Sequence, residues 1–167
     1  YIGELGYNVF DWGLGRNYGK VEYMELLIES LDELFLKNKQ QISLVGWSLG
    51  GVFARQLAKE RPELVRQVIT LGSPFRGITE PNNVEWIFTA ISGGKKAENT
   101  NHALLANLPI PALVPTTAIY SKEDGIVPWE MSMELEEDDI HQNIQVRGSH
   151  IGLGVNPSVL SVVADRL

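Results

Sequence analysis

The sequence predicts an α/β protein built on a mostly parallel, doubly wound sheet, and three observations lead to this prediction. Short apolar runs typical of buried strands alternate with longer amphipathic runs typical of helices. The stretch Gly46-Trp-Ser-Leu-Gly50 is a tight turn between one such strand and one such helix. No internal repeat and no long linker interrupts the alternation. We therefore expect residues 1–167 to form a single domain.

The first half of the chain predicts three strands and two helices. Residues 8–12, 41–45 and 67–71 are short apolar runs of strand length. Residues 20–37 and 49–59 instead repeat apolar side chains three and four positions apart, which predicts two helices with one core-facing side each.

The second half predicts two more strands and a final helix, separated by an interruption. Residues 115–121 and 143–147 have the composition of strands. Asn156 followed by Pro157 is a helix cap followed by a proline at the first helical position. Residues 76–112 break the rhythm, because nearly forty residues separate two strands; they include a short amphipathic run and a Gly-Lys turn.

The Gly-x-Ser-x-Gly pentad makes Ser48 the candidate nucleophile. A serine on a sharp turn between strand and helix is held in a strained conformation that aims its hydroxyl at a cleft. We expect glycine at positions 46 and 50 because a Cβ would crowd the turn and the helix. The backbone N–H of Leu49 would lie free at the helix N-terminus, where it could bind an oxyanion.

A serine hydroxyl needs a base, and the chain has three histidines. His150 follows the last predicted strand and precedes the last helix, at a position where α/β sheets carry functional residues. His102 lies in a polar stretch and His141 follows the acidic run 134–139, so we interpret both as surface side chains. His150 is the candidate base.

The acid that orients this base should follow an intermediate strand. Asp124 lies directly after the strand predicted at 115–121 and precedes a glycine. It is also a good turn residue, and Glu123, Asp138 and Asp139 compete with it. The acidic run favours a solvated face, so we favour Asp124 as the candidate acid, with Glu123 on the same turn as the alternative.

The order Ser48, Asp124, His150 is the order used by α/β-hydrolases. The chain resembles the bacterial esterase and lipase branch of this superfamily over nearly its whole length. The resemblance rests on residues 43–51, 68–77, 124–128 and 149–153. It implies that Ser73 is a turn residue lining the cleft rather than a second nucleophile, and that residues 76–112 form a small cap. A helix packed on the outer face of the sheet is the alternative for that insertion.

The resemblance implies a serine hydrolase that cleaves carboxylic esters through an acyl-enzyme. Trp47, Trp86, Phe88 and Leu104 are candidates for the acyl pocket, although burial beneath the turn is slightly favoured for Trp47. The superfamily takes a second oxyanion donor from an earlier strand, which the sequence lacks, so we expect a C-terminal portion of a longer protein or a processed chain. An acyltransferase with the same triad and a non-catalytic binding domain remain alternatives.

The composition of the chain excludes several classes of binding partner. The net charge of −7 argues against binding nucleic acid or anionic membranes. The chain has no cysteine, which excludes disulfides, thiolate catalysis and cysteine metal sites. We expect a small-molecule or lipid ester as substrate, no cofactor, no metal and no stable membrane insertion. The oligomeric state stays open. For compartment, a soluble cytoplasmic protein is slightly favoured and secretion stays open.

Overall fold

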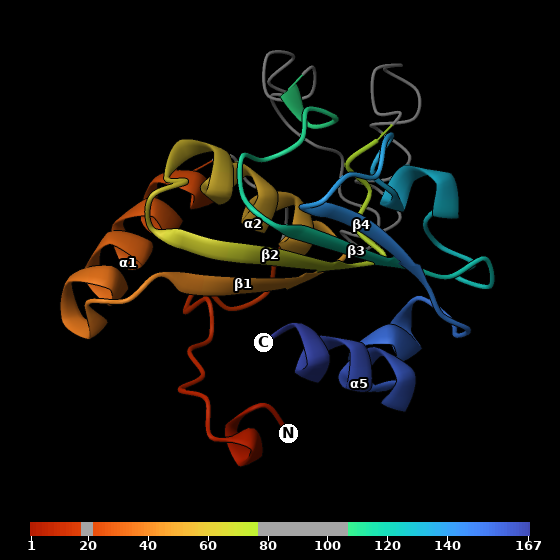
Figure 1. The fold of residues 1–167 in the computed structure, drawn as a ribbon, viewed down its shortest axis with the longest axis horizontal. Coiled ribbons are helices and arrows are strands. Elements are labelled where there is room, and N and C mark those ends of the chain that lie inside the picture. The colour runs from red at the N-terminus through yellow and green to blue at the C-terminus, as the bar shows by residue number, and fades with distance from the viewer. Residues whose placement is uncertain (18–21, 77–106) are drawn as a thin grey trace.

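The computed structural model describes residues 1–17, 22–76 and 107–167. The described strands form one parallel sheet in the order β1 (Ile42–Trp47), β2 (Val65–Leu71), β3 (Thr116–Tyr120) and β4 (His141–Gln145). All four strands run in the same direction and therefore end at the same edge of the sheet (Figure 1).

Helices cover both faces of this sheet, as a doubly wound arrangement requires. Helices α1 (Tyr23–Asn38) and α2 (Leu49–Glu60) lie on one face, and α5 (Pro157–Arg166) lies on the other (Figure 1). Three short 3₁₀ helices complete the described elements: Gly3–Leu5, Trp129–Ser132 and Ile151–Val155. The predicted fold class is confirmed.

Two apolar clusters hold the layers together, one on each face. The α1 and α2 side buries Leu27, Leu31, Phe53, Leu57 and Val68 among others. The α5 side buries Ile69, Ile119, Leu153, Val159 and Val163 among others. Adjacent residues of β2, Val68 and Ile69, belong to opposite clusters, as the alternation of side chains along a strand demands.

Most predicted elements lie within a few residues of the observed ones. Asn156 caps α5 as expected, because its side chain accepts a hydrogen bond from the Ser158 N–H at 2.9 Å. The last strand begins at His141, two residues before the predicted start.

The strand predicted at residues 8–12 is wrong. These residues have no strand partner, and Val9 and Phe10 are exposed. The chain turns instead, because the Asp11 carboxylate accepts the Gly13 N–H at 3.0 Å. The Trp12 ring packs against the rings of Tyr23 and Phe53. This apolar residue therefore forms a side-chain contact with the helices and is not part of a strand.

The proposed cap falls mainly on residues 77–106, which lie outside the described residues, as do Trp86, Phe88, Leu104 and His102. The segment that follows is tied to α2 by two basic side chains that donate to its carbonyls. Lys59 reaches Asn107 at 2.5 Å, and Arg55 reaches Ile110 at 3.3 Å. Burial, together with repulsion from Arg55, lowers the pKa of Lys59 to about 8 despite the attraction of Glu134.

Glu134 lies in the acidic run, and the structure corrects its predicted solvated position. It is buried and forms an ion pair with Arg55, which is itself fully buried on α2. The guanidinium also lies 3.8 Å from the centroid of the Phe75 ring. Burial lowers the pKa of Arg55, and the attraction and hydrogen bonds of Glu134 oppose this shift. The rest of the run, from Leu135 to Asp139, is exposed as expected.

The turn between β1 and α2 is closed by two glycines. A Cβ on Gly46 would overlap the backbone of Gly51, and a Cβ on Gly51 would overlap the Ser73 hydroxyl and approach the Gly46 carbonyl oxygen to 2.8 Å. Gly50 has no described atom within 4 Å of such a Cβ, so its predicted steric role is wrong. Ser73 is fully buried in this contact and does not line a cleft; its hydroxyl oxygen lies 3.4 Å from the carbonyl oxygens of both Gly46 and Leu71, which share its single proton.

We expect Gly46→Ala to lower the free energy of unfolding by at least about 1–3 kcal/mol, because the clash is with backbone that cannot rotate away. Gly50→Ala is the matched control and should leave stability unchanged or raise it by up to about 1 kcal/mol, since Gly50 lies within α2. Urea denaturation of both variants measures the difference. Equal stability of the two variants would contradict the close-packing argument.

We also expect Glu134→Ala to cost about 3–5 kcal/mol, because it leaves the Arg55 guanidinium buried without a counter-charge. The double variant Arg55→Met/Glu134→Leu removes both charges and should be more stable than the single variant. Denaturant midpoints of the two variants test this order, and the opposite order would show that the ion pair does not set the cost.

Candidate active site

Ser48 stands at the carboxyl end of β1, on the residue that reverses the chain into α2. Its backbone angles, φ 56° and ψ −127°, lie in a region that side-chain-bearing residues rarely occupy. The Ser48 N–H donates to the carbonyl of Leu71 at 2.9 Å, which ties the turn to β2. Leu49 is the first residue of α2, so the helix itself offers no acceptor for its N–H.

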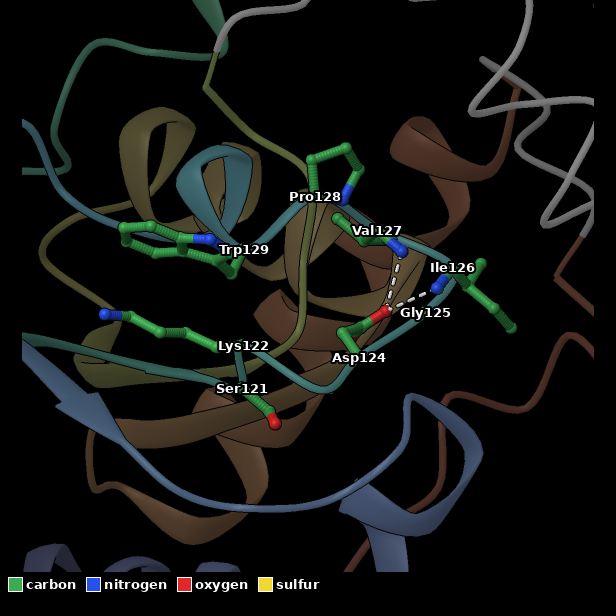
Figure 2. A pocket seen from close by; sticks show the side chains of 8 residues that line it. All are labelled: Ser121, Lys122, Asp124, Gly125, Ile126, Val127, Pro128 and Trp129. Atoms are coloured by element: carbon green, nitrogen blue, oxygen red, sulfur yellow. Dashed lines mark hydrogen bonds between the residues drawn. The ribbon is translucent and has the colours of Figure 1, made fainter.

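Asp124 lies on the loop after β3, four residues past the end of the strand. One carboxylate oxygen, Oδ1, accepts the N–H groups of Ile126 at 3.0 Å and Val127 at 2.6 Å (Figure 2). The side chain is almost fully buried. These bonds fix the carboxylate plane and leave Oδ2 to point at a different partner. Its competitor Glu123 is exposed.

That partner is His150, on the loop after β4. Asp124 Oδ2 lies 2.7 Å from His150 Nδ1, and His150 Nε2 lies 3.0 Å from the Ser48 hydroxyl oxygen. A carboxylate can only accept, so Nδ1 carries the proton and Nε2 is free to accept from Ser48. All three side chains are buried. The structure therefore joins the three predicted residues in one chain of hydrogen bonds.

Gly72, at the end of β2, is a site residue that the sequence reasoning missed. β2 lies between β1 and β3, so Gly72 lies between the loops of Ser48 and Asp124. With φ at 54°, a Cβ here would lie 2.9 Å from Asp124 Oδ2 and 3.3 Å from His150 Nδ1. The available signal was the Leu-Gly-Ser-Pro stretch directly after an apolar strand.

Trp47 is not buried beneath the turn as the sequence slightly favoured, since 43% of its surface is exposed. Its ring lies beside the His150 ring, with centroids 5.5 Å apart. The role of Trp47 as a substrate contact stays a prediction.

A pocket of about 260 Å³ lies at the loop that carries Asp124, and Asp124 forms part of its lining. Lys122 and Trp129 form part of its lining, and the Lys122 ammonium lies 4.7 Å from the centroid of a Trp129 ring (Figure 2). Ser121 also lines the pocket, and its hydroxyl oxygen accepts the N–H groups of Glu123 and Gly148. The Ser121 hydroxyl thus bonds the backbone of two loops.

His141 is buried rather than on the surface, and the structure corrects that prediction. Its Nδ1 lies 2.9 Å from Asp138 Oδ2, and its Nε2 lies 2.8 Å from the Ala112 carbonyl oxygen. Both nitrogens face acceptors, which only the protonated ring can satisfy. Burial lowers the pKa of His141, but the bonds to Asp138 and Ala112 and the nearby carboxylates outweigh burial and raise it overall. Asp138 therefore pairs with His141, and Asp139 is exposed.

Two further properties concern the described residues alone. Within 1–17, 22–76 and 107–167, no three metal-binding side chains cluster. Among the helices so described, none has the length and apolar character needed to cross a membrane.

A family model for palmitoyl protein thioesterase matches residues 18–123, which is more than half of the chain. The chain belongs to the palmitoyl protein thioesterase family. The match includes Ser48 and ends one residue before Asp124, so the positions of Asp124 and His150 rest on the geometry above. A search of curated proteins found no match.

Solved structures place this family member in the α/β-hydrolase fold. The monoacylglycerol lipase of Paleococcus ferrophilus is 15% identical with a TM-score of 0.59, over 90% of this chain and 75% of that one. Mouse α/β-hydrolase domain-containing protein 10 is 19% identical with a TM-score of 0.59, over 96% and 72%. Lipase B of Aspergillus fumigatus is 18% identical with a TM-score of 0.62, over 86% of this chain and 40% of that one. This chain therefore spans less than half of lipase B.

The His141–Asp138 pair predicts a pH-dependent stability. Folding raises the pKa of His141, so the protonated ring stabilises the folded state. This contribution to the free energy of unfolding is complete below about pH 6.5, the ordinary histidine pKa, and is lost as the pH rises through the raised pKa. The hydrogen bond from His141 lowers the pKa of Asp138, which keeps that carboxylate ionised over this range. Asp138→Asn should therefore destabilise the protein at pH 5.5 and much less at pH 9.

Denaturant titrations of the parent and the variant at both pH values check this sign. Asp139→Asn is the matched control, because Asp139 is exposed and no interaction with His141 is expected. A loss of stability that is equal at pH 5.5 and pH 9 would contradict a charged pair.

Proposed function

We propose that this chain is a serine hydrolase that cleaves acyl thioesters and related carboxylic esters, with Ser48 as nucleophile, His150 as general base and Asp124 as its orienting acid. One observation carries the proposal: a single imidazole lies 2.7 Å from Asp124 and 3.0 Å from the Ser48 hydroxyl. The family match, whose description names palmitoyl protein thioesterase, supports an acyl thioester as substrate. The α/β-hydrolase fold is compatible with both substrate types.

In the first half-reaction, the Ser48 oxygen attacks the acyl carbonyl carbon while its proton moves to His150 Nε2. Asp124 holds Nδ1–H and stabilises the imidazolium that forms. The Leu49 N–H is proposed to bind the carbonyl oxygen as it gains negative charge. The bond from the carbonyl carbon to sulfur or oxygen then breaks, the leaving group takes the proton from Nε2, and the acyl group remains on Ser48.

In the second half-reaction, water attacks the acyl-enzyme. His150 accepts a proton from that water, and the Ser48 oxygen takes it back as the fatty acid leaves. The two substrate types differ in the first step, because a thiol with a pKa near 8.5 leaves without full protonation whereas an alkoxide does not. A thioester therefore demands less of His150 as an acid than an oxygen ester of the same acyl chain.

The proposal predicts that a fluorophosphonate adds once to the parent protein and not to Ser48→Ala, as measured by intact mass. Ser158→Ala is the control, because Ser158 is an exposed serine at the start of α5. Turnover of a palmitoyl thioester should fall by about 10⁴–10⁶-fold in Ser48→Ala and His150→Gln, and the two losses should not add. An adduct that persists in Ser48→Ala would overturn the assignment of the nucleophile.

The choice of substrate is tested by comparing kcat/KM for a palmitoyl thioester, the matching oxygen ester and short-chain versions of both. Preference for the long thioester supports the proposal. Preference for the short oxygen ester would replace it with a simple carboxylesterase.

A further inference from the structure

We propose that Trp47 is a positioning residue for His150, which holds the base from the nucleophile side; this inference rests on the proposed function. The indole Nε1–H of Trp47 donates to the backbone carbonyl of His150 at 3.0 Å. The two rings are tilted by 38° with centroids 5.5 Å apart. Trp47 therefore contacts His150 both at its backbone and at its imidazole.

The sheet order shows why such a tie is needed. His150 lies on the loop after β4, and Ser48 follows β1, on the opposite edge of the described sheet. With neighbouring strands about 4.8 Å apart, the loop must cross roughly 14 Å to bring the imidazole to Ser48. An element that spans such a distance keeps its far end in place only if groups there hold it.

His150 is held on the acid side by two bonds. Its backbone N–H donates to the Asp124 carbonyl at 2.9 Å, and Nδ1 bonds the Asp124 carboxylate at 2.7 Å. On the β1 side the bonds come from two adjacent residues, Trp47 and Ser48. The end of β1 thus positions both the hydroxyl that attacks and the histidine that takes its proton.

The two β1-side bonds have different fates during the proposed reaction. The bond between Ser48 and Nε2 is lost when the serine carries an acyl group, because the hydroxyl proton is gone. The bond from Trp47 to the His150 carbonyl involves no reacting atom and persists. Among the described residues, Trp47 then still holds His150 on the β1 side while His150 activates water. Removing the Trp47 bond should therefore lower turnover more than it weakens substrate binding.

Trp47→Phe tests this role, since phenylalanine keeps an aromatic ring but has no N–H. Trp12→Phe is the matched control, because the Trp12 indole also donates to a backbone carbonyl, that of Gly15 at 2.6 Å, in the cluster around α1 and α2. We expect Trp47→Phe to lower kcat by about 10–100-fold with little change in KM, and to shift the pH profile of kcat. We expect Trp12→Phe to leave both constants near those of the parent.

A spectroscopic readout tests the contact without turnover. A protonated imidazole next to an indole quenches its fluorescence, so the parent should show a pH-dependent step in tryptophan emission. The step should be absent in Trp47→Phe and in His150→Gln and present in Trp12→Phe. A parent that hydrolyses nothing but keeps this pattern would refute the proposed function and leave the contact standing.

Three results would overturn the inference. One is a rise in KM with unchanged kcat in Trp47→Phe, which would make Trp47 a substrate contact only. The second is kinetics and pH profiles of Trp47→Phe equal to those of Trp12→Phe. The third is an emission step that is missing in the parent or retained in Trp47→Phe.

Discussion

The close approach of Gly46 to Gly51 is the constraint on which the rest of the site depends. Without side chains at these positions, β1 and the first turn of α2 can pack backbone to backbone, which forces the chain to reverse at Ser48. The reversal holds Ser48 in a strained conformation that costs about 1–3 kcal/mol. The burial of α2 against β1 and β2 offsets this cost. It also places the hydroxyl at the edge of the sheet where the loops after β3 and β4 arrive.

A buried carboxylate and a buried imidazole are stable in this place only because their polar atoms are paired. Asp124 accepts two backbone N–H groups at one oxygen and the His150 ring at the other. Gly72 supplies no functional group, yet it leaves the space in which the carboxylate and the imidazole meet. The central strand β2 thus contributes to the site through the side chain it lacks. His150 is therefore held from two sides, by the Asp124 loop after β3 and by the end of β1.

Family membership and the proposed triad rest on partly different segments of the chain. The family match includes Ser48 and ends before the other two members of the proposed triad. The hydrogen bonds that reach Asp124 and His150 depend on the parallel order of the sheet. Two other charged pairs differ from the triad in their role: Arg55 with Glu134, and His141 with Asp138. These pairs tie loops to α2 and to β4. They support the fold and make no contact with the triad that the structure describes.

Local signals in the sequence were sufficient for most elements and for the three candidate residues. These features depend on neighbours in the chain: the cap at Asn156, the strand-turn-helix pattern around Ser48, and the positions of Asp124 and His150 after strands.

The wrong predictions concern residues whose burial or pairing depends on distant partners. Glu134 is buried because Arg55, 79 positions away, neutralises it, and His141 is buried because the carbonyl of Ala112, 29 positions away, meets its ring. Residues 8–12 have strand composition but pair with none of the four described strands. The sequence by itself determined which three residues are candidates for the chemistry, since residue type and strand ends are local properties. Only the tertiary structure decided which polar groups are buried and that Trp47 reaches His150, because both depend on contacts between segments that the chain order does not bring together.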